Sequence, residues 1–299
     1  MVGKKGMLIY HSNAGKGKIQ NNLEACVPIL SPGHSSLLVQ QTFEPGEALD
    51  ICRRYGEDLD VIYIMGGDGT VHECVNGLSG LSKRPVVGIL PAGTCNDFSR
   101  SLGIPQNLRR AAETMLSGQV KYIDVGKANH NYFLNFWGIG LITETSKNID
   151  TEEKSILGKL SYLLSAVRTI GDNEQIRYKI TYDGKIIEDQ AILVLVTNGN
   201  YIGTNKLPFP LIEYTDGLLD VIIVKNSDFG TVKQILSVKR TERQLTDADA
   251  GVMYFQSKEI TIETLKKVNV DMDGEVYTQT PCNISLLPRH LPMIYGDEF

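Results

Sequence analysis

The sequence predicts an α/β domain followed by a mostly antiparallel β domain. The chain has 299 residues, a length that typically forms about two domains. Before about Lys127, short apolar runs alternate with segments of helical periodicity, which indicates βαβ units and a parallel sheet with both faces covered. After that point strand patterns dominate, and two helical patterns interrupt them.

In the first part, each short apolar run predicts a strand, because it is bounded by turn residues or by a helical pattern. The predicted strands are Met7–Tyr10, Ser36–Gln40, Val61–Met65, Val86–Leu90 and Tyr122–Val125. The segments between them predict helices, and in the first of these Leu23, Val27 and Leu30 fall on one face. The predicted helices are Ile19–Leu30, Pro45–Tyr55, Val71–Leu78 and Leu108–Leu116.

In the second part, most segments have the composition of strands. The predicted strands are Tyr132–Trp137, Arg177–Tyr182, Lys185–Asp189, Ala191–Thr197, Leu218–Val224, Glu259–Thr264 and Val268–Met272. The pair Asp183-Gly184 predicts a hairpin, since Asp-Gly suits the positive φ angles of a tight turn. Ser155–Ile170 and Phe229–Ser237 predict helices.

Composition and charge argue against several classes of protein. The formal net charge is −5 and the pI is about 5.6, so the chain lacks the overall basic field of a nucleic-acid-binding protein. No run of about 18 apolar residues predicts a membrane span. The five cysteines include no C-x-x-C pair, which argues against a disulfide framework or a zinc site and favours the reducing cytoplasm.

A glycine-rich loop, Gly66–Thr70 (Gly-Gly-Asp-Gly-Thr), follows one predicted strand and precedes a predicted helix. Glycines allow backbone N–H groups to approach phosphate oxygens, and the N-terminus of a helix favours negative charge. Asp68 would repel a polyphosphate unless a cation lies between them, so we expect it to hold Mg²⁺ directly or through water. The alternative interpretation is a tight βα turn with a capping aspartate.

The motif continues beyond this loop. Glu73, Asn76 and Gly77 follow in the run Gly-Gly-Asp-Gly-Thr-Val-His-Glu-Cys-Val-Asn-Gly-Leu. This run resembles the nucleotide motif of the diacylglycerol kinase catalytic-domain family, which covers soluble bacterial lipid kinases and the related sphingosine and ceramide kinases. NAD kinases and phosphofructokinases share the shorter Gly-Gly-Asp-Gly core, so the longer run favours the lipid-kinase branch. The resemblance extends over nearly the whole chain.

The resemblance implies an NAD-kinase-like parallel-sheet domain and a β-sandwich-like domain. Residues 1–127 would form the nucleotide-binding α/β domain, rejoined by about residues 289–299, and residues 128–288 would form a β-rich domain for the lipid substrate. The implied enzyme transfers the γ-phosphate of ATP to a lipid hydroxyl, as in phospholipid biosynthesis. Diacylglycerol, which would become phosphatidic acid, is the first expected acceptor, and another glycerolipid or a sphingoid base would also offer a primary hydroxyl.

The resemblance also implies which residues bind ATP. They are His11, Ser12, Asn13, Ala14, Gly15, Lys16, Thr42, Gly66, Gly67, Asp68, Gly69, Thr70, Val71, His72, Glu73, Thr94 and Asn96. Family members usually carry Asn-Pro where this chain has His11-Ser12, whereas the Gly-Lys pair that follows is kept. Thr94 and Asn96 stand in a second loop after a predicted strand, where ligands bind in parallel sheets, although ordinary helix capping is the alternative.

Acidic side chains predict a magnesium site near the phosphate loop. The resemblance implies that Asp68, Asp97 and Asp124 join one network of aspartates, water and Mg²⁺. Three carboxylates would repel one another without a cation, so the cluster requires a metal ion or a nearby lysine, for which Lys16 is the candidate.

A second, structural Mg²⁺ is implied by the resemblance alone. Its ligands would be the side chain of Asp216 and the backbone carbonyls of Glu213 and Leu218, which are hard oxygen donors. Family members usually carry another acidic residue where this chain has Thr215, and a plain turn is the alternative.

The run Val270–Glu275 carries three acidic side chains. In an extended chain Asp271, Asp273 and Glu275 would share one face, whereas Asp273-Gly274 alternatively predicts a hairpin turn. Asp273-Gly274-Glu275 matches the family's Asp-Gly-Glu motif, whose glutamate is the proposed general base. The resemblance therefore implies that Glu275 accepts the proton of the lipid hydroxyl.

The segment Ser155–Ile170 carries apolar residues at helical spacing with basic residues among them, which predicts either packing on a core or contact with a membrane surface. We expect a cytoplasmic protein that contacts the membrane transiently to reach its lipid, without a nucleic-acid partner. The sequence leaves open whether the chain forms a homodimer. Two other functions compete: NAD kinase-like phosphorylation of a soluble dinucleotide, and non-enzymatic regulation by a bound nucleotide. The longer motif and the presence of every expected catalytic position argue against both.

Overall fold

The structure is a computed structural model that describes residues 4–12, 19–140, 175–207, 209, 212–226 and 251–296. Contacts between Cα atoms divide the chain into two compact units. The first comprises Met1–Val125 and Pro288–Phe299, and the second comprises Gly126–Leu287. The predicted helices Ser155–Ile170 and Phe229–Ser237 lie outside the described residues.

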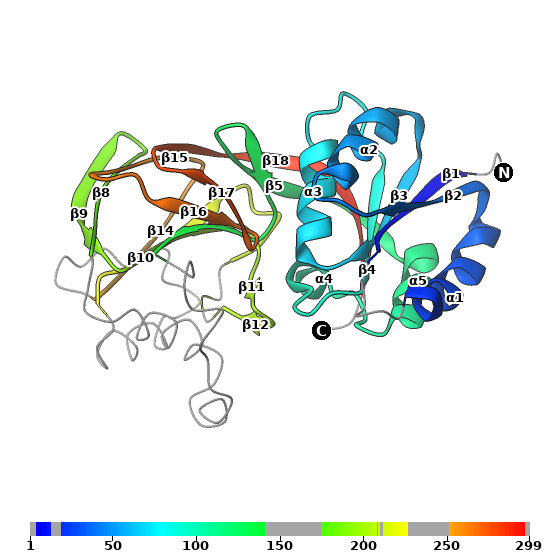
Figure 1. Ribbon diagram of the computed structural model, residues 1–299. Helices are drawn as coiled ribbons and strands as arrows, with labels where there is room; N and C mark the ends of the chain where they lie inside the picture. Colours follow the sequence, from blue (N-terminus) through cyan, green and yellow to red (C-terminus); the bar gives the residue numbers. More distant parts are fainter. Residues whose placement is uncertain are drawn as a thin grey trace, which may run out of the picture. The chain divides into compact units, whose positions relative to one another are not determined.

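The first unit contains a parallel sheet with helices on both faces (Figure 1). Its strands are β1 (Lys4–His11), β2 (His34–Thr42), β3 (Val61–Gly66), β4 (Val86–Pro91) and the C-terminal part of β18 (Cys282–Tyr295). The order is β2-β1-β3-β4-β18, and β18 joins by parallel pairing of Met293 with Val87. Every residue of β3 is buried, because a central strand of a sheet covered on both faces needs a continuous apolar run.

Helices cover this sheet. They are α1 (Ile19–Leu30), α2 (Glu47–Tyr55), α3 (Asp68–Leu78), α4 (Asp97–Ser101) and α5 (Leu108–Ser117), with the 3₁₀ helices η1 (Ser31–Gly33) and η2 (Gly56–Asp58). α1 packs against α5, and α2 packs against α3. The second pair approaches closely at Gly77, where a Cβ atom would lie 2.5 Å from the carbonyl oxygen of Leu49.

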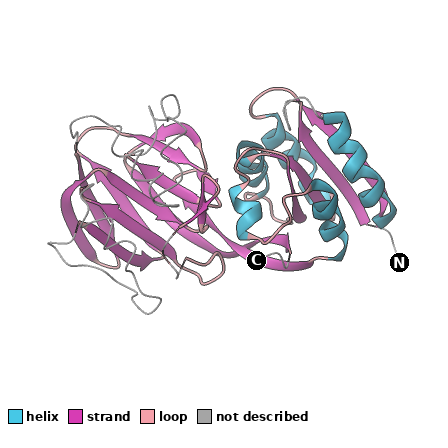
Figure 2. Cartoon of the chain, turned by 90° about the horizontal axis from the view of Figure 1, so that it is seen from below, coloured by secondary structure: helices cyan, strands magenta, loops and turns pink. Residues whose placement is uncertain are grey.

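The second unit is built from two sheets of mainly antiparallel strands (Figure 2). One contains, in order, the N-terminal part of β18, β15 (Glu259–Thr264), β8 (Ile176–Tyr182) and β9 (Lys185–Ala191). The other contains, in order, β14 (Val252–Ser257), β13 (Leu219–Val224), β10 (Leu193–Thr197), β7 (Phe136–Ile139), β16 (Asn269–Met272) and β17 (Glu275–Gln279). The short strands β11 (Tyr201–Ile202) and β12 (Asn205–Lys206) pair with each other. β6 (Asn131–Phe133) pairs with β5 (Gln119–Ala128), whose residues up to Val125 belong to the first unit.

Apolar side chains fill the space between the two sheets of the second unit. Trp137 and Phe255 of one sheet are buried in this core with Tyr182 of the other. The rings of Tyr182 and Phe255 stack with their centroids 3.9 Å apart. A further apolar cluster, which includes Phe136 and Tyr254, covers the opposite face of the sheet that contains β7 and β14.

The predicted α/β and β-rich organisation is confirmed, but one predicted strand is wrong. Tyr132–Trp137 is not continuous: it belongs to β6 and β7, which are separated at Leu134-Asn135. Here the carboxylate of Asp273 accepts the backbone N–H groups of this segment, and these bonds replace strand pairing. A local pattern of apolar residues does not reveal a break that a side chain from elsewhere in the chain creates.

Five strands, β11, β12, β14, β17 and β18, have no counterpart among the strands predicted from local sequence patterns. β18 carries Pro288 and Pro292, and proline inside a run argues against an interior strand. No helix in the described part of the chain is long and apolar enough to cross a membrane.

Candidate active site

The predicted phosphate loop lies where β3 ends and α3 begins. α3 starts at Asp68 with Gly67 as its N-cap, which is earlier than the predicted start at Val71. Thr70 therefore lies in the first helical turn and does not cap the helix. The first N–H groups of a helix have no partner within it, so this turn can receive an anion.

The loops after β3 and β4 run against each other. The N–H of Ala92 donates to the carbonyl of Gly66 at 3.0 Å. A Cβ atom at Gly93 would lie 2.3 Å from the Cα atom of Gly67, so the contact requires glycine. The structure thus brings together the two loops in which the sequence placed phosphate ligands.

Asp68 joins these two loops. Its Oδ2 accepts the backbone N–H of Asn96 at 2.9 Å, and its Oδ1 accepts that of Asp97 at 2.8 Å. Hydrogen bonds to an ionised acceptor are roughly twice as strong as neutral ones, so Asp68 fixes the second loop against the first. Each carboxylate oxygen can accept more than one bond and can therefore also receive a cation or its water.

The backbone of Asn96 adopts a left-handed conformation, with φ 55° and ψ 44°. Asparagine tolerates this conformation better than most residues. Its Oδ1 accepts the N–H of Gly93 at 2.8 Å and its Nδ2 donates to the carbonyl of Gly93 at 3.1 Å. The Asn96 side chain is thus engaged within its own loop, while the neighbouring Thr94 is exposed.

The residues that follow the phosphate loop hold helices in place. Oε1 of Glu73 accepts the N–H of Gly46 at 2.9 Å, at the start of α2. The amide of Asn76 donates to the carbonyl of His72 at 2.9 Å, and both side chains are buried. With Gly77, these residues serve the packing of α2 against α3. The side chains of Glu73 and His72, both predicted ATP ligands, are therefore engaged in structural contacts.

His11 and Thr42 are paired at the ends of β1 and β2. The N–H of Ser12 donates to the carbonyl of Thr42 at 2.9 Å. Because the carboxyl ends of parallel strands share one edge of a sheet, these residues lie at the same edge as the phosphate loop. The predicted ligands outside the described residues are Asn13, Ala14, Gly15 and Lys16.

Asp97 and Asp124 are both buried. Asp97 begins α4, and its N–H is held by Asp68. Oδ1 of Asp124, on β5, accepts the N–H of Arg289 at 2.7 Å. Within the described ranges, no three Asp, Glu, His or Cys side chains are grouped as ligands of one metal ion. Asp68 and Asp97 are thus neighbours, and a network that also includes Asp124 would have to run through water.

Asp273 and Gly274 form the turn of the β16–β17 hairpin, with φ angles of 54° and 95°. Of the two interpretations left open for this run, the structure has the hairpin, because the turn interrupts the extended run in which Asp271, Asp273 and Glu275 would share one face. Asp273 is buried and accepts the N–H groups of the β6–β7 break at 2.8, 2.8 and 3.0 Å. Asp271 accepts the N–H of Gly274 at 2.8 Å, whereas Glu275 is exposed.

The predicted ligands of a structural cation lie in a tight turn of the second unit. Oδ1 of Asp216 accepts the N–H of Leu218 at 3.0 Å, and Gly217 has a φ of 78°. The side chains of Asp216 and Glu213 are exposed at this turn. Exposed carboxylate oxygens of this kind suit a hard cation.

A fully buried carboxyl group, Asp220, lies on β13 near this turn. Its Oδ1 accepts hydrogen bonds from the hydroxyl of Tyr254 and, at 3.0 Å, from the amide of Gln256. Its Oδ2 has no hydrogen-bond partner among the described residues. Burial raises the pKa of Asp220 to about 7, and the negative charges of Asp216 and Glu213 contribute to the rise while the two hydrogen bonds oppose it.

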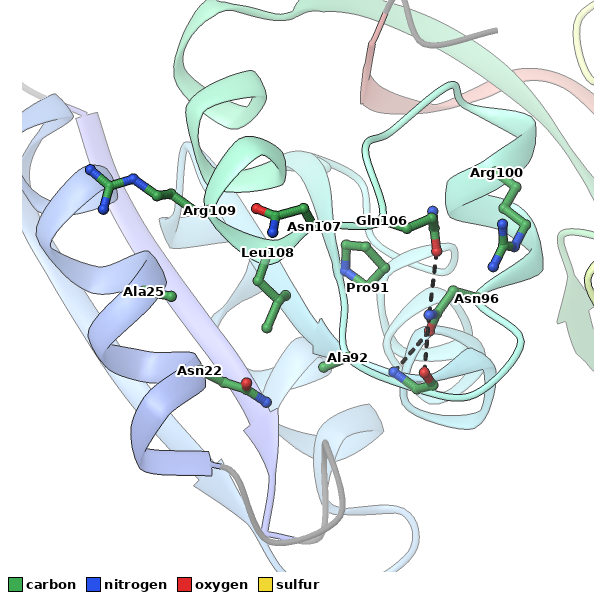
Figure 3. Close-up of a pocket in the computed structure, with 11 residues that line it drawn as sticks. Asn22, Ala25, Pro91, Ala92, Asn96, Arg100, Gln106, Asn107, Leu108 and Arg109 are labelled. Atoms are coloured by element: carbon green, nitrogen blue, oxygen red, sulfur yellow. Dashed lines mark hydrogen bonds between the residues drawn. The ribbon is translucent and has the colours of Figure 1, made fainter.

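A cavity of about 470 Å³ adjoins the loop after β4 (Figure 3). It is lined by Asn22, Ala25, Pro91, Ala92, Gly93, Asn96, Arg100, Gln106, Asn107, Leu108 and Arg109. Of the predicted ATP ligands that the structure describes, only Asn96 lines this cavity. The loop after β3 is not part of the cavity wall.

Sequence reasoning missed the contacts of Gln106 and Asp220. Gln106 interacts with Asn96 across a turn and a short helix, and no local motif marks it. Asp220 stands in an otherwise apolar strand, Leu219–Val224, and an isolated acid in such a run is a signal that could have been followed.

The chain matches two protein families, one in each part of its sequence. Residues 5–128 match the family described as "Diacylglycerol kinase catalytic domain", and residues 140–295 match the "YegS C-terminal NAD kinase beta sandwich-like domain". Staphylococcus aureus proteins named "Putative lipid kinase", from strains Mu3 and Newman, are each 33% identical to this chain. Each alignment covers 97% of this chain and 96% of the relative.

Two crystal structures from Bacillus anthracis str. Sterne are also similar. One, described as "a putative diacylglycerol kinase", is 43% identical, with a TM-score of 0.85 over 99% of this chain and 97% of that chain. Another, described as a diacylglycerol kinase, is 38% identical, with a TM-score of 0.81 over 99% of this chain and 98% of that chain. Sequence, domain architecture and fold agree over the full length, and the chain therefore belongs to the diacylglycerol kinase catalytic-domain family.

Proposed function

We propose that this chain transfers the γ-phosphate of ATP to a lipid hydroxyl, and that the acceptor is diacylglycerol, which becomes phosphatidic acid. One observation carries the proposal: Asp68 ties together the loops at the carboxyl ends of β3 and β4, where a parallel sheet binds its ligand. Membership of a lipid-kinase family supports a lipid acceptor over a soluble dinucleotide.

The phosphates of ATP would lie against the loop after β3. Gly67 and Gly69 permit close approach, and the N-terminus of α3, a helix of 11 residues, favours negative charge. Thr94 would contact ATP from the adjoining loop, and Lys16, which lies outside the described residues, would contact it as the resemblance implies. His11, Ser12 and Thr42 would complete the site from the same edge of the sheet.

The residues at this site suit Mg²⁺. Asp68 would hold the ion directly or through water, because carboxylate oxygens are hard ligands that suit Mg²⁺. Asp97 and Asp124 would contribute through water. Bound Mg²⁺ neutralises phosphate charge. The implied second ion would be held by Asp216 and by the carbonyls of Glu213 and Leu218.

Glu275 is the proposed general base. It stands exposed beside a turn that Asp271 and Asp273 hold, so its own carboxylate is not required to keep the hairpin folded. Glu275 would accept the proton of the lipid hydroxyl while the hydroxyl oxygen bonds to the γ-phosphorus. The bond from that phosphorus to the bridging oxygen then breaks, which leaves ADP and the phosphorylated lipid.

Diacylglycerol resides in a membrane, so the protein would reach it by transient peripheral contact. The chain has a net charge of −5, and anionic membranes repel acidic proteins. We therefore expect the membrane contact to be weak or confined to a small part of the surface. The segment Ser155–Ile170, whose apolar residues have basic residues among them, lies outside the described residues.

Asp68→Asn tests the proposal. Asparagine keeps the shape of the side chain and one acceptor but loses the charge that holds a cation. We expect kcat for diacylglycerol phosphorylation to fall by about 10²-fold or more, because the charge acts on the transferring phosphate. The melting temperature should fall by no more than about a few degrees, because one of the two N–H groups that Asp68 accepts loses its acceptor.

Asp58→Asn is the matched control, since Asp58 is an exposed aspartate in η2. It should keep wild-type kcat. If Asp68→Asn retains activity within a few-fold of the wild type at saturating Mg²⁺, the role given to Asp68 is wrong.

A further inference from the structure

Hydrogen bonds that run through Gln106 and Ser99 form a closed ring at Asn96. Figure 3 shows the bond between Asn96 and Gln106. Oε1 of Gln106 accepts from Nδ2 of Asn96 at 3.4 Å, and Nε2 of Gln106 donates to Oγ of Ser99 at 3.0 Å. Oγ of Ser99 in turn donates to the carbonyl of Asn96 at 2.8 Å. Gln106 thus holds Asn96 at its side chain and, through Ser99, at its backbone carbonyl.

The conformation of Asn96 decides what Asp68 can bind. The left-handed turn at Asn96 presents two successive N–H groups, of Asn96 and Asp97, to the two oxygens of Asp68. A residue other than glycine adopts this conformation only where its surroundings stabilise it. The ring supplies part of that stabilisation.

We propose that Gln106 is a positioning residue for Asp68 and acts on it through Asn96. The inference rests on the proposed function, in which the Asp68 carboxylate must stand at a fixed place beside Mg²⁺ and ATP. Gln106 itself lies in the connection between α4 and α5 and is not a predicted ligand of the nucleotide, the metal or the lipid.

A change at Gln106 should loosen the Asn96 turn without unfolding it. The two bonds between Asn96 and Gly93 do not involve Gln106 and would persist. Gln106 is only half-buried, so an apolar side chain of similar size at this position creates no cavity. The expected result is a misplaced Asp68 in a folded protein.

Gln106→Leu in the full-length chain is the test, with Ser99→Ala as a second variant that opens the other half of the ring. Amide hydrogen exchange of Asn96 and Asp97 is measured together with kcat, the KM for ATP and the melting temperature. We expect exchange at these two amides to quicken by about 10-fold and kcat to fall by about 10-fold, because small misplacements of a catalytic group cost rate. The KM for ATP should stay within about 2-fold of the wild type, since a positioning residue does not bind ATP.

Gln190→Leu, which replaces a half-buried glutamine on β9, is the matched control and should change none of these quantities. If Gln106→Leu shows wild-type amide exchange and wild-type kcat while Asp68→Asn is inactive, the positioning role of Gln106 is wrong. The proposed function would then still stand. A fall in melting temperature with kcat unchanged would assign Gln106 a structural role and would also overturn it. Full activity of Asp68→Asn would instead overturn the proposed function itself.

Discussion

Two aspartate side chains of the predicted motifs, one in each unit, fix backbone segments by accepting hydrogen bonds from N–H groups. Asp68 holds two such groups and Asp273 holds three. The sequence predicted a role for Asp68 in the phosphate loop, whereas it gave Asp273 no role beyond its place in the Asp-Gly-Glu motif. Their bonding partners could not be predicted, because Asp273 and Leu134 are 139 positions apart and only the tertiary fold brings them together.

Asp220 shows the opposite case, a buried carboxyl group whose ionisation is unfavourable in the folded chain. Its pKa rises from the ordinary 3.8 to about 7. Between these values the folded state holds a proton that the unfolded state has lost, so the stability of the fold decreases as pH rises from about 4 to above 7. Below about pH 4 both states are protonated and the penalty is absent.

Asp220→Asn should therefore stabilise the chain at alkaline pH. The amide oxygen can still accept from Tyr254 and Gln256, and no charge is buried. We expect the variant to gain on the order of 2 kcal/mol over the wild type at about pH 8, seen as a rise of several degrees in melting temperature, and less at about pH 5. The scans are made in EDTA, so that a cation bound at the Asp216 turn does not contribute.

Equal melting temperatures of the variant and the wild type at both pH values would show that Asp220 carries no such penalty. Asp58→Asn, at an exposed aspartate, serves as the control and should shift neither scan.

At the scale of elements, the turn of the β16–β17 hairpin holds Asp271 and Asp273 in structural hydrogen bonds and leaves Glu275 exposed. Sequence reasoning left two interpretations open for Val270–Glu275, an extended run and a hairpin, and the structure has the hairpin. Local turn chemistry carries this information, since Asp-Gly suits two successive positive φ angles. The hydrogen bonds that Asp273 accepts from the backbone between β6 and β7 cannot be predicted from any local sequence pattern.

Glu275→Gln tests the assignment of the base within this hairpin. Glutamine keeps the shape of the side chain but cannot accept the hydroxyl proton, so kcat should fall by about 10² to 10⁴-fold while the KM for ATP changes little. The measurement is kcat and KM for ATP across a Mg²⁺ titration. An unchanged kcat would remove Glu275 from the mechanism, and rescue by high Mg²⁺ would assign it to the metal instead.

Asp273→Asn provides the contrast on the same turn. It places an amide where three N–H groups need acceptors, and it should lower the free energy of unfolding by about 1–3 kcal/mol. Glu275→Gln should leave the melting temperature unchanged, because Glu275 is exposed. The two variants thus separate loss of chemistry from loss of structure.

For the molecule as a whole, periodicity predicts the α/β part better than the β-rich part. α1 begins and ends at Ile19 and Leu30 as predicted, because its apolar residues recur at helical spacing and fix its buried face. No local pattern predicted β18, because its two prolines weaken the strand signal, and only the resemblance implied that residues 289–299 rejoin the first domain. Its two ends pair with β15 and with β4. Such pairing of distant segments is a tertiary property that no local window of sequence contains.

The central claim is that this chain phosphorylates a lipid with ATP. The direct measurement is transfer of labelled γ-phosphate from ATP to diacylglycerol in mixed micelles, beside another glycerolipid, a sphingoid base and NAD. We predict Mg²⁺-dependent labelling of diacylglycerol that exceeds labelling of the other lipids, no labelling of NAD, and loss of the signal in Asp68→Asn. Labelling of NAD with none of the lipids, or no transfer to any acceptor by the wild-type chain, would contradict the account.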